Sequence, residues 1–83
     1  MEFSVYILFS NKLNKFYVGT SNDVNNRILE HNNIKYPNAF TEKGIPWELF
    51  LAIDNLSSEQ AFALEKHIKK MKSKNYIINL KKF

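Results

Sequence analysis

The sequence predicts an α+β fold, a small three-stranded sheet flanked by helices. Three segments, residues 3–9, 15–19 and 47–53, contain aromatic and β-branched residues in an alternating pattern that is typical of strands. Two other segments, residues 24–31 and 58–72, place apolar residues at helical spacing, and each follows residues that cap helices. Because 45% of the chain is hydrophobic, we expect a packed core and not a disordered chain.

Composition excludes several classes of function. The chain has no cysteine, which excludes a disulfide framework, a thiolate zinc site and a cysteine nucleophile. No apolar run approaches the ~20 residues that span a bilayer, so we expect a cytoplasmic protein without a membrane partner. Residues 66–82 contain seven lysines and no acidic residue, which favours a nucleic-acid partner, although a solvated helix face has the same composition. At this length, residues 1–83 should form a single domain.

The first predicted strand, residues 3–9, is apolar on both faces, so we expect it to be covered on both sides. Residues 10–14 have the composition of a turn. A four-residue loop would pair Tyr6 with Gly19 and would make Tyr6 and Tyr17 diagonal neighbours on one face of the sheet. A loop that differs by one residue would put the two tyrosines on opposite faces.

The region from Tyr17 to His31 contains the only arginine and one of the two glycines. Gly19 permits either a special backbone angle or the close approach of another group to the main chain. Residues 21–23, Ser-Asn-Asp, are N-cap types that predict the start of a helix. On this helix Arg27 and His31 are one turn apart, beside the apolar stripe. A half-buried structural ion pair is one interpretation of Arg27. Since the chain otherwise uses lysine, its single guanidinium favours bidentate recognition of phosphate or carboxylate.

The segment after this helix, residues 32–46, is rich in turn formers and predicts a loop. Residues 47–53 form the third predicted strand, and residues 54–56 should end it. Either Ser57 or Ser58 should then cap the long second helix. That helix should run to about Lys72, and a short helix around residues 76–78 should follow.

One carboxylate lies on the apolar face of the long predicted helix. Projection at 100° per residue puts Glu65 in the middle of a stripe formed by Ala61, Leu64, Ile68 and Met71. An ionised carboxylate there costs several kcal/mol unless it meets a cation. Two interpretations stay open: a structural ion pair with Arg27, or a site for a hard cation such as Mg²⁺, held by one or two carboxylates and substrate phosphate.

Two lysines of this helix lie nearest to the edges of the Glu65 stripe. From this position we expect Lys69 and Lys72 to contact the phosphate backbone of a nucleic acid. Such contacts position the nucleic acid through positive charge and do not depend on its base sequence. Lys66 and Lys70 should point further into solvent.

The ordered set of residues resembles the GIY-YIG nuclease domain over essentially the whole chain, in particular the small stand-alone bacterial proteins of that superfamily. The matching features are Val5-Tyr6-Ile7, ten residues between Tyr6 and Tyr17, Tyr17-Val18-Gly19, Arg27 eight positions after that glycine, the Arg27-x-x-x-His31 pair, Thr41, and Glu65 followed by Ile68-Lys69-Lys70. The first motif has Ser4 in place of its glycine, and the second reads Tyr-Val-Gly.

The resemblance implies an antiparallel three-stranded sheet and metal-dependent hydrolysis of a nucleic-acid phosphodiester, with DNA as the expected partner in repair or another nucleic-acid process. It also implies that the two tyrosines, the arginine, the histidine and the glutamate surround one groove. Glu65 would hold one Mg²⁺ or Mn²⁺ and Arg27 would neutralise phosphate charge. Tyr6 is the candidate base, Tyr17 would orient the water or phosphate, and His31 would assist proton transfer.

Two other functions remain as alternatives. The first is a catalytically idle nucleic-acid-binding module with the same fold. The second is a protein-interaction domain that uses the strand edge at residues 47–50.

Overall fold

A computed structural model describes residues 2–33 and 43–82, and the elements follow the predicted order. The strands are β1 (Phe3–Ser10), β2 (Lys15–Ser21) and β3 (Trp47–Leu56), and the helices are α1 (Val24–Asn32), α3 (Ser58–Met71) and α4 (Lys74–Leu80). This arrangement confirms the α+β class. Thr41, one of the residues that carry the family resemblance, lies outside the described residues.

The three strands form one antiparallel sheet in the order β2-β1-β3, so β1 is central and β2 is an edge strand. Of the loop lengths that the sequence left open, the hairpin between β1 and β2 has the four-residue loop, so that Tyr6 pairs with Gly19 and Ser10 with Lys15. Its four-residue loop ends at Asn14, whose φ of 54° is the left-handed conformation that asparagine tolerates. The prediction that Tyr6 and Tyr17 share one face is therefore confirmed.

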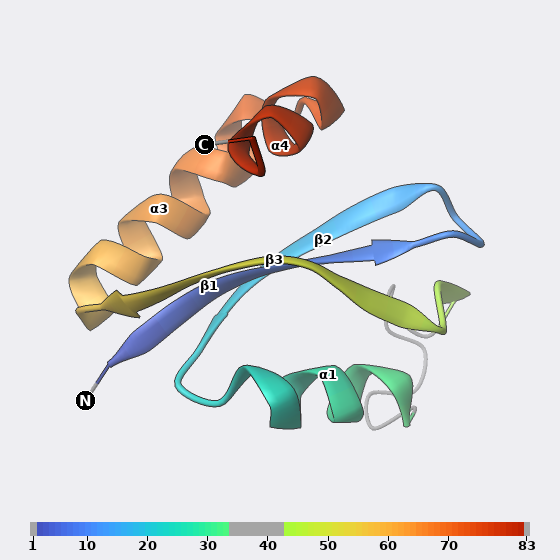
Figure 1. The fold of residues 1–83 in the computed structure, drawn as a ribbon, viewed down its shortest axis with the longest axis horizontal. Helices are drawn as coiled ribbons and strands as arrows, with labels where there is room; N and C mark the ends of the chain where they lie inside the picture. The colour runs from blue at the N-terminus through green and yellow to red at the C-terminus, as the bar shows by residue number, and fades with distance from the viewer. Residues whose placement is uncertain (1, 34–42, 83) are drawn as a thin grey trace.

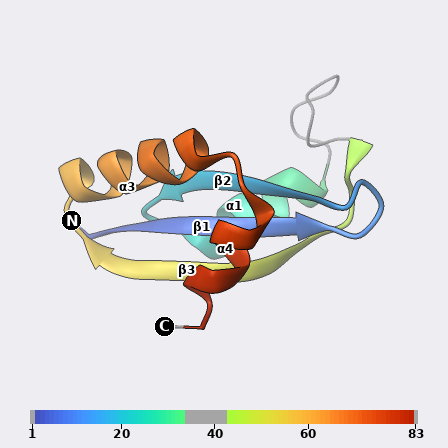
Figure 2. The same ribbon diagram turned by 90° about the horizontal axis from the view of Figure 1, so that it is seen from above.

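Helices cover both faces of the sheet (Figure 1), as the apolar faces of β1 predicted. Helix α1 lies on one side, whereas α3 and α4 lie on the other. Viewed from above, α3 follows the β2 edge and α4 crosses nearer β1 and β3 (Figure 2). The α1 face buries Tyr6, Leu8 and Trp47, with Val24 and Ile28 packed against them. The opposite face buries Val5, Ile7, Val18, Ala61, Ile68 and Ile77.

The predicted end of the third strand was wrong. Strand β3 continues through the polar pair Asp54-Asn55 to Leu56, and it pairs with Phe3 at that end. The register shifts between Val5 and Phe3, and Asn55 has a φ of 63°. The turn-forming residues thus make an irregularity within the strand, as an extra residue in a β-bulge does, and not its end.

Helix α3 begins with a capping box, in which the Ser57 hydroxyl accepts from the Gln60 amide and the Gln60 side chain accepts from the Ser57 amide. It ends at Met71, followed by Lys72 in the left-handed conformation. Met71 is exposed, which corrects its placement on the buried stripe, because the last turn extends past the apolar contact with the sheet. Within residues 2–33 and 43–82, none of the helices combines the length and apolar character needed to cross a bilayer.

Candidate active site

Two phenols and one imidazole, each from a different element, meet on the α1 face of the sheet. The hydroxyl of Tyr6 on β1 lies 3.3 Å from Nε2 of His31 on α1, and both residues are buried. The ring of Tyr17 on β2 lies edge-on to His31, with centroids 4.9 Å apart, and 6.4 Å from the Tyr6 ring. The structure thus brings together three of the predicted catalytic residues.

Gly19 makes room for the Tyr6 phenol. The two residues are cross-strand partners, and a Cβ atom built on Gly19 would overlap the end of the Tyr6 ring. No glycine in the described part of the chain has a positive φ. The sequence left two reasons for a glycine at this position, a special backbone angle or the close approach of another group. The structure supports close approach, and the approaching group is the side chain of Tyr6.

Helix α1 is fixed at both ends, which holds His31 against the sheet. The Asp23 side chain caps the helix by accepting from the Asn26 amide at 3.1 Å, as the N-cap residues predicted. At the other end the Asn32 side chain accepts from the Trp47 amide at 2.7 Å and donates to the Trp47 carbonyl at 3.0 Å. The end of α1 is thereby tied to the start of β3, next to the buried imidazole.

The environment of His31 favours its neutral form. Burial lowers the pKa of His31 below its usual value of 6.5, and the positive charge of Arg27 lowers it further, while Glu30 acts in the opposite direction. Arg27 lies one turn before His31, its side chain 42% exposed, with a guanidinium nitrogen 3.7 Å from the Glu30 carboxylate. A neutral imidazole at physiological pH can both accept and donate a proton.

Glu65 lies on the other face of the sheet. Its Oε1 accepts a hydrogen bond from the Thr20 hydroxyl of β2 at 2.5 Å, and its Oε2 pairs with the Lys69 ammonium at 2.7 Å. The side chain is 21% exposed, so the expectation that it faces the core is corrected: α3 follows the edge of the sheet, and Glu65 lies at the rim. Among the described residues its cationic partner is Lys69, not Arg27.

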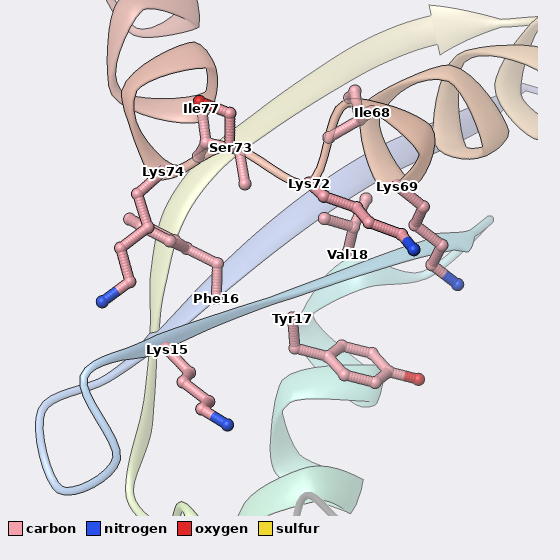
Figure 3. A pocket seen from close by; sticks show the side chains of 10 residues that line it. All are labelled: Lys15, Phe16, Tyr17, Val18, Ile68, Lys69, Lys72, Ser73, Lys74 and Ile77. Carbon is pink, nitrogen blue, oxygen red and sulfur yellow. The ribbon is translucent and has the colours of Figure 1, made fainter.

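Edge strand β2 separates the carboxylate from the aromatic cluster. Tyr17 and Gly19 contribute to the α1 face, whereas Val18 and Thr20 alternate with them toward α3. In Figure 3 the Tyr17 ring extends from β2 toward α1, away from Val18. The predicted site residues thus fall on the two sides of one strand.

The donor set around Glu65 can be compared with the needs of a divalent cation. No three histidine, aspartate or glutamate side chains come together among residues 2–33 and 43–82, so these residues offer no complete protein cage. A single carboxylate fits Mg²⁺ or Mn²⁺ in the mode in which water and substrate phosphate complete the coordination. Because Lys69 already pairs with Oε2, a cation at Glu65 would compete with this ammonium.

The sequence interpretation missed Thr20, which donates to Glu65. Thr20 comes directly after Gly19 on β2, and because side chains alternate along a strand, it faces away from Tyr17. Identifying its partner required the packing of α3 on β2. Lys69 and Lys72, which were predicted to bind nucleic acid, lie at the rim of a groove together with Lys15 and Lys74, which were not singled out.

Comparison with known proteins gives one match. A family model described as GIY-YIG catalytic domain matches residues 2–78, nearly the whole chain. No curated protein and no solved structure matches the chain significantly.

Proposed function

Because the chain belongs to the GIY-YIG catalytic domain family, whose members are generally endonucleases, we propose that it hydrolyses phosphodiester bonds in DNA with the help of one Mg²⁺ or Mn²⁺ ion. A role in repair or another nucleic-acid process is the corresponding biological proposal. The observation that carries the enzymatic proposal is the buried contact between the Tyr6 hydroxyl and His31. A phenol in contact with a neutral imidazole is a pair that can move a proton at physiological pH.

Hydrolysis needs a base for the attacking water and positive charge near the phosphate. Tyr6 takes the proton of the water while His31 accepts the phenolic proton, so that the pair acts as a relay. Tyr17, in ring contact with His31, orients the water or the phosphate. The Arg27 guanidinium is partly exposed and can bind a phosphate through its fork of donors.

Glu65 is the residue that would hold the divalent cation, with Thr20 fixing the orientation of its carboxylate. When bound, the cation would neutralise charge on a phosphate oxygen. An all-protein cage is not required for this role, since Mg²⁺ usually keeps several waters.

A catalytically idle nucleic-acid-binding module is the second candidate. The observation that favours it is the ion pair between Lys69 and Glu65, which places a cation of the chain itself on the expected metal ligand. If Lys69 stayed paired with Glu65 under all conditions, the carboxylate could not hold a metal ion, and the protein would bind DNA without cleaving it.

A cleavage assay separates the two functions. Labelled single-stranded and duplex DNA are incubated with the protein in Mg²⁺, Mn²⁺ or EDTA, and we expect cleavage with either ion and none in EDTA. Glu65→Gln should abolish cleavage yet keep the fold, because a partly exposed ion pair contributes only about 0–1 kcal/mol. Glu59→Gln, at an exposed position in the first turn of the same helix, is the matched control and should cleave normally.

Two results would contradict this proposal. Intact DNA with every ion would favour the idle binding module. Normal cleavage by a destabilised Glu65→Gln protein would show that Glu65 has a structural role and holds no catalytic metal.

A further inference from the structure

A groove lies between β2 and the junction of α3 with α4, on the α3 face of the sheet (Figure 3). Its volume is about 330 Å³, at the lower end of the range of about 300–1,000 Å³ for ligand pockets. Its apolar lining includes Phe16, which is only partly buried, together with Val18, Ile68 and Ile77, which belong to the buried core. The groove therefore has an apolar floor anchored in the core of the protein.

The rim of this groove is basic. Among the residues that the structure describes, four lysines and no acidic residue line it: Lys15, Lys69, Lys72 and Lys74. The side chains of Lys72 and Lys74 make no hydrogen bond or ion pair with any other residue in the described part of the chain. An occupant should therefore carry negative charge near the rim and an apolar surface over the floor.

The groove is adjacent to the candidate active site. Lys69, on its rim, pairs with Glu65, and Tyr17, from the strand that forms one wall, contacts His31. In Figure 3 the ends of Lys69 and Lys72 extend to the same side as the Tyr17 hydroxyl. A strand held at the rim would therefore pass along the β2 edge, between Glu65 on the α3 side and Tyr17, whose ring contacts His31 on the α1 side.

We propose that this groove binds an unpaired nucleotide of the substrate, with backbone phosphates on the rim lysines and the base on the apolar floor. The substrate class would then be single-stranded DNA or an unpaired segment next to a duplex. This inference rests on the proposed function for its substrate, but the groove itself is defined independently of the catalytic residues.

The apolar floor decides between single-stranded and duplex DNA. In a duplex the bases are stacked inside, so the phosphates would satisfy the lysines while the floor stayed in contact with water. An unpaired strand supplies both a charged backbone and the face of a base. Single-strand-binding grooves combine basic residues with aromatic side chains on which bases stack, and Phe16 contributes an aromatic ring to this floor. Charge complementarity with the rim lysines would suit duplex and single-stranded DNA equally. The apolar floor favours single-stranded DNA.

Binding is measured by fluorescence anisotropy in EDTA, so that no cleavage occurs. The ligands are a short oligothymidylate, an abasic strand with the same number of phosphates, and a duplex of the same length. We expect the oligothymidylate to bind more tightly than the duplex. The abasic strand should bind at least about fivefold more weakly, which corresponds to about 1 kcal/mol for one base contact.

A double variant tests the location of the site. Lys72→Gln combined with Lys74→Gln should flatten the dependence of log affinity on log salt by about 1.4 units for single-stranded DNA, from about 0.7 for each phosphate contact. The matched control changes Lys66 and Lys70 to Gln, two exposed lysines of α3 that do not line the groove, and should have less than half of this effect.

Three outcomes would overturn the inference: equal affinity for the abasic strand, duplex binding as tight as single-strand binding, and equal salt dependence in the two double variants. Because binding is measured without divalent ions, the result is separate from that of the cleavage assay. A protein that meets all three expectations but cuts no DNA would refute the proposed enzyme and leave the groove assignment in place.

Discussion

Replacing Gly19 by alanine should destabilise the protein, although this change within a strand normally has the opposite effect. Gly19 has no positive φ, so alanine can adopt its backbone conformation. Loss of conformational entropy in the unfolded chain would then stabilise the fold by about 0.5–1 kcal/mol. Any net destabilisation must therefore come from the space that the new methyl group occupies.

That space belongs to the Tyr6 ring. The added Cβ would lie 2.9 Å from Cε1 and closer still to the hydroxyl end of the ring. Tyr6 is 3% exposed and has Tyr17 and His31 beside it, so its ring cannot move freely. Overpacking costs about 1–3 kcal/mol, and loss of the hydrogen bond to His31 about 0.5–1.5 kcal/mol. After the entropic gain, we expect a net loss of about 0.5–4 kcal/mol.

The loss is measured by urea unfolding of the Gly19→Ala protein, and in a thermal melt it corresponds to about 4–8 °C for each kcal/mol. Tyr6→Phe removes the hydroxyl and part of the overlap. In this background Gly19→Ala should therefore cost at least about 0.5 kcal/mol less, a coupling that a double-mutant cycle resolves. A Gly19→Ala protein as stable as the wild type, or more stable, would refute the close approach of Tyr6 as the reason for the glycine.

Three other features give further predictions. Since the pKa of His31 is lowered by burial and by Arg27, the unfolded chain binds a proton that the folded chain does not. The free energy of unfolding should thus fall as the pH drops below about 6.5, and His31→Gln should remove this slope in urea titrations. Arg27→Lys keeps the charge but loses the planar fork, so single-turnover cleavage should slow at least about tenfold with DNA affinity in EDTA kept; an equally active variant would contradict phosphate recognition by the fork. Thr20→Val should slow cleavage and change stability by less than about 1.5 kcal/mol, and rescue by Thr20→Ser would identify the hydroxyl that positions Glu65.

The hairpin could be predicted from the sequence, and its register could be narrowed to the alternatives set by the loop length, because its determinants are local. Turn residues locate the loop, and once its length is known, alternation fixes which side chains share a face; the structure selects the four-residue loop. The end of β3 could not be predicted in this way. Asp54 and Asn55 favour a turn, but Asn55 adopts its left-handed conformation inside the strand, where pairing with β1 resumes at Leu56. Long-range pairing thus overrode a local signal.

The candidate site was predictable to a similar extent. The spacing of Arg27 and His31 on one helix placed them beside the apolar stripe, and the structure buries His31 there. Helical projection also found Glu65, but it could not tell the core from the rim, because this depends on how α3 lies across the sheet. For the same reason the hydrogen bond from Thr20 had no signal in the sequence.

Because side chains of β2 alternate between the two faces of the sheet, the length of the hairpin loop determines which of them face α1, with Tyr6 and His31, and which face α3, with Glu65. A change in loop length that shifts β2 by one residue would turn Tyr17 and Gly19 toward α3, and Val18 and Thr20 toward α1. A shift by two residues would keep the faces but displace every side chain by about 6.6 Å along the strand. Insertions in residues 11–14 should therefore have different effects for odd and even shifts of β2. An odd shift moves each β2 side chain to the opposite face of the sheet, and an even shift keeps its face but displaces it along the strand.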